Sequence, residues 1–77
     1  MALSKTQVIK MVGTKIRTIR HAKGLSIEKV ALEAGIEYTQ LSRIERGKIN
    51  TSIYQIYKIS CSLDTKVPEI FNELHKH

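Results

Sequence analysis

The chain has 77 residues, with 13 lysines and arginines against 7 acidic residues, and a single cysteine. A chain of this length forms one small domain that buries only about 60% of its unfolded surface, and such domains often gain stability by oligomerising. One cysteine excludes an internal disulfide, no apolar run could span a membrane, and the N-terminus lacks the apolar core of a signal peptide. We therefore expect a single domain over residues 1–77, located in the cytoplasm.

The basic charge is concentrated near the N-terminus, because no acidic residue precedes Glu28. Six lysines and arginines lie before that position, which equals the net charge of +6, and the charges after it balance. A basic surface favours an anionic polymer or a membrane as partner. Charge alone does not decide between these two partners.

Helical periodicity covers nearly the whole chain, and no strand pattern competes with it. Ser4 followed by Gln7 predicts a capping box that opens a first helix, which ends at Lys23 and Gly24. The apolar face of this helix carries Val8, Val12, Ile16 and Ile19. The opposite face carries Lys10, Thr14, Arg17 and His21.

Two short helices follow. Ser26 caps the first of them, which runs to Ala34, and the second spans about residues 37–46. Gly35 lies where the first must stop, because glycine tolerates the left-handed conformation that such a stop needs. The small Ala31 lets the second helix cross the first closely. This combination is typical of a helix-turn-helix, whose second helix enters the major groove of DNA.

Two more helices complete the expected fold. Asn50, Thr51 or Ser52 caps the fourth, and Pro68 fits the first turn of a fifth over about residues 67–75. The residues expected to be buried on the fourth helix are Ile53, Ile56, Ile59 and Leu63. The sequence thus predicts an all-α fold, a compact five-helix bundle in which the second and third helices form the helix-turn-helix.

Three segments carry a resemblance to a known family: GTKIRTIRHAKGLSIEKVALEAGI, LSRIERGK and SIYQIYKISCSL. They resemble the lambda-repressor/Cro-like helix-turn-helix family, also called the xenobiotic-response-element family, over roughly residues 12–71. Within that family, ERGK, Asn50, SIYQIYKI and Leu63-Asp64 are most similar to controller proteins of restriction–modification systems. The resemblance implies a small free-standing dimer that binds DNA and regulates its own operon.

The chain departs from the family pattern at three positions. Ile27 stands where the family often has Gln, so a phosphate or base contact from that side chain is absent. Glu37 replaces the usual Ser, Thr or Pro at the turn into the third helix, where its carboxylate suits a helix N-terminus and could accept from a cytosine amine. Many members have proline near Thr51, and its absence here should change only how the fourth helix starts.

The outward face of the third helix carries the candidate base-reading residues. On a helical wheel Leu41 and Ile44 face inward. Arginine can donate two hydrogen bonds to guanine, and threonine can contact a thymine methyl. The alternative is an ordinary solvated face, with Tyr38 packed against the preceding helix. The residues that we expect to reach base edges are Tyr38, Thr39, Ser42 and Arg43.

Four other polar side chains are candidates for contacts to DNA phosphates, although each could instead be an ordinary surface group. They are Arg17, Arg46, Lys48 and Asn50. Backbone N–H groups near Ile27 and Ile53, at two helix starts, offer further donors. The family resemblance also implies an ion pair between Arg20 and Glu45, which would tie the first helix to the third and have a structural role.

No residue pattern predicts catalysis, a metal site or a cofactor. The three histidines are scattered, and one cysteine and one aspartate form no metal cluster and no nucleophile–base pair. His75 and His77 could bind a metal only adventitiously. We expect no enzyme activity and no small-molecule ligand.

The C-terminal third has more apolar surface than so small a core can use, and aromatic residues are favoured in interfaces. We therefore expect a homodimer, with the fifth helix contributing to dimerisation; the alternative is that these residues close the core of a monomer. The expected interface residues are Tyr54, Tyr57, Cys61, Ile70, Phe71 and Leu74.

The expected partners are a pseudo-palindromic double-stranded DNA, a second copy of the chain and, as a further candidate, RNA polymerase. The predicted function is sequence-specific regulation of transcription, of the autoregulatory controller type. Two alternatives stay open. One is an antitoxin-like regulator whose main partner is a protein, and the other is a helix-turn-helix that serves only as a protein-interaction adaptor.

Overall fold

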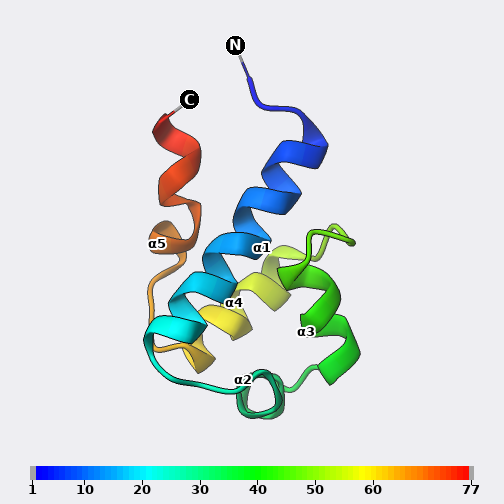
Figure 1. The fold of residues 1–77 in the computed structure, drawn as a ribbon, viewed down its shortest axis with the longest axis vertical. Coiled ribbons are helices and arrows are strands. Elements are labelled where there is room, and N and C mark those ends of the chain that lie inside the picture. The colour runs from blue at the N-terminus through cyan, green and yellow to red at the C-terminus, as the bar shows by residue number, and fades with distance from the viewer. Residues whose placement is uncertain (1, 77) are drawn as a thin grey trace.

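Five α-helices and a terminal 3-10 helix follow one another along residues 2–76, the part of the chain that the computed structural model describes (Figure 1). Their bounds are α1 Lys5–Ala22, α2 Ile27–Ala34, α3 Tyr38–Glu45, α4 Ile53–Ser62, α5 Val67–Phe71 and the 3-10 helix η1 Asn72–Lys76. No strand occurs within these residues. The predicted all-α class and the predicted order of five helices are confirmed.

Three of the helices have a serine as N-cap, and its hydroxyl accepts a hydrogen bond from a backbone N–H of the first turn. Ser4 and Gln7 form a capping box, with Gln7 N–H donating to Ser4 Oγ at 3.1 Å and Ser4 N–H donating to Gln7 Oε1 at 2.8 Å. Ser26 caps α2. Of the three residues considered for the start of α4, Ser52 is the cap, because its hydroxyl accepts from the Gln55 N–H at 3.1 Å.

The turn between α2 and α3 has the expected left-handed stop. Gly35 has φ of 70° and ψ of 34°, and the Ile36 N–H donates to the Ala31 carbonyl at 3.0 Å. Buried Ala31 and Ala34 allow α3 to cross α2 closely. Within the bundle α2 contacts both α3 and α4, whereas α1 contacts α3 and α5. Figure 1 shows α1 running between α3 and α5, with α2 at the end opposite the two termini.

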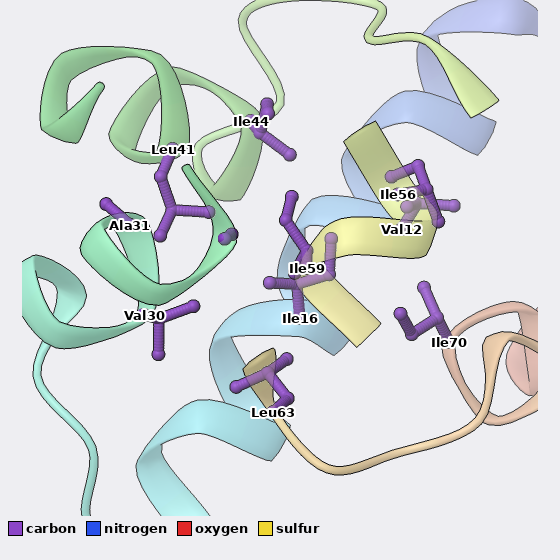
Figure 2. Packing of buried hydrophobic residues seen from close by; sticks show 11 residues of the cluster. Val12, Ile16, Val30, Ala31, Leu41, Ile44, Ile56, Ile59, Leu63 and Ile70 are labelled. Carbon is purple, nitrogen blue, oxygen red and sulfur yellow. The ribbon is translucent and has the colours of Figure 1, made fainter. Parts of the chain in front are cut away.

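All five α-helices contribute to one apolar core, shown in Figure 2. Ile16, Val30, Leu41, Ile59 and Ile70 come one from each helix, and each is exposed by 1% or less. Close packing of this kind fixes the helices relative to one another. The packing of this core therefore holds the short helix α3 in a fixed orientation relative to the other helices.

Two predictions about burial were wrong. Ile53 was expected in the core, but it is 90% exposed, because it is the first residue of α4 and the neighbouring helices cover the apolar stripe of α4 only from Ile56 onward. Ile70 was expected at a dimer interface, but it is 1% exposed within the single chain and has no surface left to offer.

The fifth helix is shorter than predicted. An α-helix covers only Val67–Phe71, with Pro68 in its first turn, and the expected remainder tightens into η1 Asn72–Lys76. Helices commonly end in 3-10 geometry, since it supplies partners for terminal carbonyl groups. No helix within residues 2–76 is long and apolar enough to cross a membrane.

Candidate nucleic-acid interface

The outer face of α3 is polar and open to solvent. Leu41 and Ile44, exposed by 0% and 2%, hold the opposite face against the core. Thr39 and Arg43 are exposed, Ser42 is half-buried, and Tyr38 is 50% exposed at the start of the helix. The four residues that the sequence selected as base readers thus lie on the accessible part of α3, and Tyr38 is not buried against α2.

The C-terminal end of α3 is attached to α1 by a bidentate ion pair. Arg20 donates from Nε to Glu45 Oε2 at 2.8 Å and from Nη2 to Glu45 Oε1 at 2.9 Å. Its remaining nitrogen, Nη1, donates to the Leu25 carbonyl at 2.9 Å. Arg20 is 9% exposed and Glu45 is 5% exposed. The hydrogen bond to Glu45 raises the pKa of Arg20 above its ordinary value, although burial opposes this rise.

The candidate phosphate contacts lie on α1 and around the loop between α3 and α4. The side chains of Arg17, Arg46, Lys48 and Asn50 are all exposed. At about 100° per residue, Arg17 lies about 40° from Gly13, the residue of α1 that meets the end of α3. The charged stripe of α1, which consists of Lys10, Thr14, Arg17 and His21, therefore borders the helix-turn-helix. DNA that contacts α3 would also lie near this stripe.

Lys10 also belongs to this basic surface, although it was not among the phosphate contacts expected from the sequence. A Cβ built on Gly47 would lie 2.8 Å from Lys10 Cγ, so the stem of Lys10 crosses the start of the loop that carries Lys48 and Asn50. Its position on the charged stripe was visible in the sequence. Its proximity to the loop was not, because that contact depends on how α1 crosses α3.

An apolar groove of about 570 Å³ opens beside α4, bounded by the N-terminal half of α1, the α3–α4 loop and α5. Ile53 lies along it and is almost fully exposed, and Tyr57, which also lines it, is 54% exposed. The residues that line it are Val8, Ile9, Val12, Ile44, Ile49, Asn50, Thr51, Ile53, Ile56, Tyr57, Val67 and Phe71.

Aromatic side chains continue this apolar surface along α4. Tyr54, 65% exposed, stacks on Tyr57 with ring centroids 6.3 Å apart, and Lys58 Nζ lies 5.1 Å from the Tyr54 ring centroid. Cys61 is exposed one turn further along, and its interaction with the Tyr57 side chain raises the pKa of the tyrosine. Phe71 and Leu74 are half-buried against the core.

No group of three or more histidine, cysteine, aspartate and glutamate side chains that could hold a metal occurs in the described part of the chain. The side chains of His75 and His77, which were considered for adventitious metal binding, lie outside those that the structure describes.

Comparison with known proteins agrees with this geometry. The helix-turn-helix family model matches residues 16–70, which include both helices of the motif and most of the core. The chain belongs to the helix-turn-helix family.

The relatives of this helix-turn-helix protein are regulators. It is 40% identical over 63 residues to the HTH-type transcriptional regulator SlrR of Bacillus subtilis. The aligned residues cover 80% of this chain and 41% of SlrR. It is 35% identical over 65 residues to the control protein C.MunI of a Mycoplasma species, covering 83% of this chain and 88% of C.MunI. The chain spans about half the length of the Bacillus regulators that it matches.

A solved structure shows the same fold. The restriction-modification controller protein C.AhdI from Aeromonas hydrophila superposes with a TM-score of 0.80 at 35% identity, over 82% of this chain and 96% of that one. This helix-turn-helix protein thus shares its fold with C.AhdI over almost the whole length of the C.AhdI chain.

Proposed function

We propose that this protein binds double-stranded DNA sequence-specifically and regulates transcription, with α3 as the recognition helix. The observation that carries the proposal is the division of α3 into two faces. Buried Leu41 and Ile44 fix the helix in the bundle, and its exposed face presents Thr39 and Arg43 to solvent. Guanine edges suit a bidentate arginine, and thymine methyl groups suit threonine, so this face can read bases in a major groove.

Phosphate contacts from the basic surface around α3 supply the non-specific part of the affinity. Arg17, Arg46, Lys48 and Asn50 are the side chains that we assign to them, and Lys10 is a further candidate. A net charge of +6 favours association with a polyanion. The place of action is the cytoplasm, where the DNA of such an operon lies.

We assign the protein to the controller type, which acts in a restriction–modification operon and regulates its own gene. The similarity to two controller proteins supports this assignment, because the match covers 88% of C.MunI and 96% of the C.AhdI structure. The described residues are taken up by the helix-turn-helix and its supporting bundle. We propose the concentration of the protein as the control variable, and RNA polymerase bound nearby is a candidate for the regulated partner.

The proposed active form is a homodimer that joins through the apolar groove and the tyrosines of α4. Ile53, Tyr54 and Tyr57 are the exposed members of this surface, and Cys61, Phe71 and Leu74 adjoin them. Covering such a surface favours association through the hydrophobic effect. A two-fold dimer would place two α3 helices in successive major grooves about 34 Å apart, on a pseudo-palindrome.

The experiment that tests this function is selection of bound duplexes from a random pool, followed by binding at several salt concentrations. We expect enrichment of a two-fold-symmetric sequence, together with affinity that falls steeply with salt. A protein-interaction adaptor would enrich no sequence and would show no salt-sensitive binding to DNA. That result would overturn the proposal.

A further inference from the structure

Gly13 lies in the middle of α1 and is buried. A Cβ built on it would overlap the main-chain oxygen of Ile44 and would lie 3.0 Å from that of Glu45. Both oxygens belong to the last turn of α3. The backbone of α1 therefore rests directly on the end of α3, and in this arrangement only a residue without a side chain fits between them.

A second glycine faces α1 from the other side of the same crossing. Gly47 follows α3 with φ of 69°, and a Cβ there would lie 3.0 Å from the Cα of Lys10. The Gly47 N–H donates to the Ile44 oxygen at 3.1 Å, which is the same oxygen that Gly13 contacts. Because Lys10 and Gly13 are neighbours one turn apart on α1, both glycines belong to one region in which the backbone of α1 and the end of α3 approach closely.

We propose that Gly13 is a positioning residue for base recognition, acting through α3. It sets how closely α3 rests on α1, and therefore where Arg43, the residue before Ile44, is presented to DNA. The inference depends on the DNA-binding function proposed above. The bidentate Arg20–Glu45 pair holds the same end of α3, so a side chain at position 13 would push that end outward against a fixed attachment.

Helix propensity and the close contact make opposite predictions for Gly13→Ala. Alanine is the better helix former, so the substitution would stabilise α1 if the crossing had room for a methyl group. The overlap with the Ile44 oxygen leaves no such room, because a main-chain atom within a helix cannot rotate away. We therefore expect Gly13→Ala to melt at a lower temperature than the wild-type chain and yet remain helical at low temperature.

The test compares Gly13→Ala with the wild-type chain on two probes, a duplex that the wild-type chain enriches from a random pool and a scrambled duplex of equal length. Binding is measured well below both melting temperatures, and circular dichroism confirms folding. We expect the enriched duplex to lose about tenfold in affinity, comparable with the loss of one base contact. Affinity for the scrambled duplex should change by less than about threefold, because the phosphate contacts remain.

Ile70→Val is the matched control, because it removes a buried methyl group from α5, which contacts α1 and α4 but makes no substantial contact with α3. It should lower the melting temperature without changing the ratio of the two affinities. If both variants lose the same part of the ratio between the affinities for the enriched and the scrambled duplex, the role of Gly13 is purely structural and the inference is overturned. Unchanged discrimination in Gly13→Ala would also overturn it, while leaving the proposed function intact. If the wild-type chain enriches no duplex, the proposed function fails and the inference fails with it.

Discussion

Arg20 and Glu45 are 25 residues apart in the sequence and are joined by two parallel hydrogen bonds of 2.8 and 2.9 Å, almost entirely out of solvent. A buried pair of this kind costs solvation energy on both ions, so the pair is weak evidence for net stabilisation. Its clearer effect is geometric. It ties the end of the proposed recognition helix to α1 in a single orientation, because the fork of the guanidinium matches the carboxylate.

Arg20→Ala should destabilise the fold by about 3 kcal/mol or more, because it leaves the carboxylate of Glu45 buried without its partner. For a domain of this size that loss corresponds to a fall in Tm of more than about 10 °C. Thermal melting followed by circular dichroism measures it. The melting temperature should fall first, and DNA binding should fall as a consequence.

Lys15→Ala is the comparison variant for the same measurement. Lys15 pairs with Glu73 at 3.6 Å on the surface, with the two side chains 22% and 44% exposed, and pairs of this kind contribute about 0–1 kcal/mol. The double variant Arg20→Met with Glu45→Leu should recover much of the stability lost in Arg20→Ala, since it removes both buried charges. If the double variant melts no higher than Arg20→Ala, the uncompensated charge does not explain the loss.

Lys48→Ala should weaken binding to specific and random duplexes alike. Lys48 is exposed in the loop after α3, and removing one phosphate contact should make the log–log dependence of affinity on salt shallower by about one unit. Lys66→Ala serves as the control, because Lys66 precedes α5, which lies across α1 from α3 in Figure 1. A salt titration that gives the same slope for Lys48→Ala and the wild-type chain would remove Lys48 from the phosphate contacts.

The sequence was sufficient to predict the helices, because their start and stop signals are local. The Ser4–Gln7 box, the Ser26 cap and the left-handed Gly35 each act through neighbouring residues, and each is where the pattern placed it. The Arg20–Glu45 pair is a long-range contact, and it was predicted only through family resemblance. The outward polar face of α3 followed from its periodicity, but no periodicity states which base a side chain contacts.

The errors arose where packing decides the outcome. Ile53 and Ile56 share one stripe of α4, yet they are 90% and 6% exposed, because the neighbouring helices cover the stripe only from its second member onward. The opposite error affected Ile70, whose place in the core depends on how α5 docks. Gly13 lies between buried Val12 and exposed Thr14, and only the crossing of α1 and α3 shows why a side chain cannot fit at this position.

Ile53→Gln combined with Tyr54→Gln should yield a folded protein that is largely monomeric at micromolar concentration. Both residues are exposed in the single chain, at 90% and 65%, so the substitutions should leave the core intact. Phe71 is a less suitable position, because it packs against the core. Sedimentation measures the association. The double variant should bind a full two-fold operator poorly, because each half-site then binds one chain independently.

Leu32→Gln is the matched control for association, since Leu32 is 81% exposed but lies on α2, away from the groove. It should sediment as the wild-type chain does. If the double variant stays dimeric, or if Leu32→Gln becomes monomeric to the same degree, the interface does not lie on the groove and α4.

Arg43→Ala should cost about 1–3 kcal/mol on the selected duplex and should relax sequence preference at one base pair per half-site, if Arg43 donates two hydrogen bonds to a guanine. Arg43 is exposed on α3 one turn after Thr39, so its removal should leave the melting temperature almost unchanged. Affinity for random duplexes should fall much less, because the contacts assigned to Lys48 and its neighbours do not depend on sequence. Binding to single-base variants of the selected duplex measures the relaxed preference. An equal loss on selected and random duplexes would make Arg43 a phosphate contact and would leave base reading to Tyr38, Thr39 and Ser42.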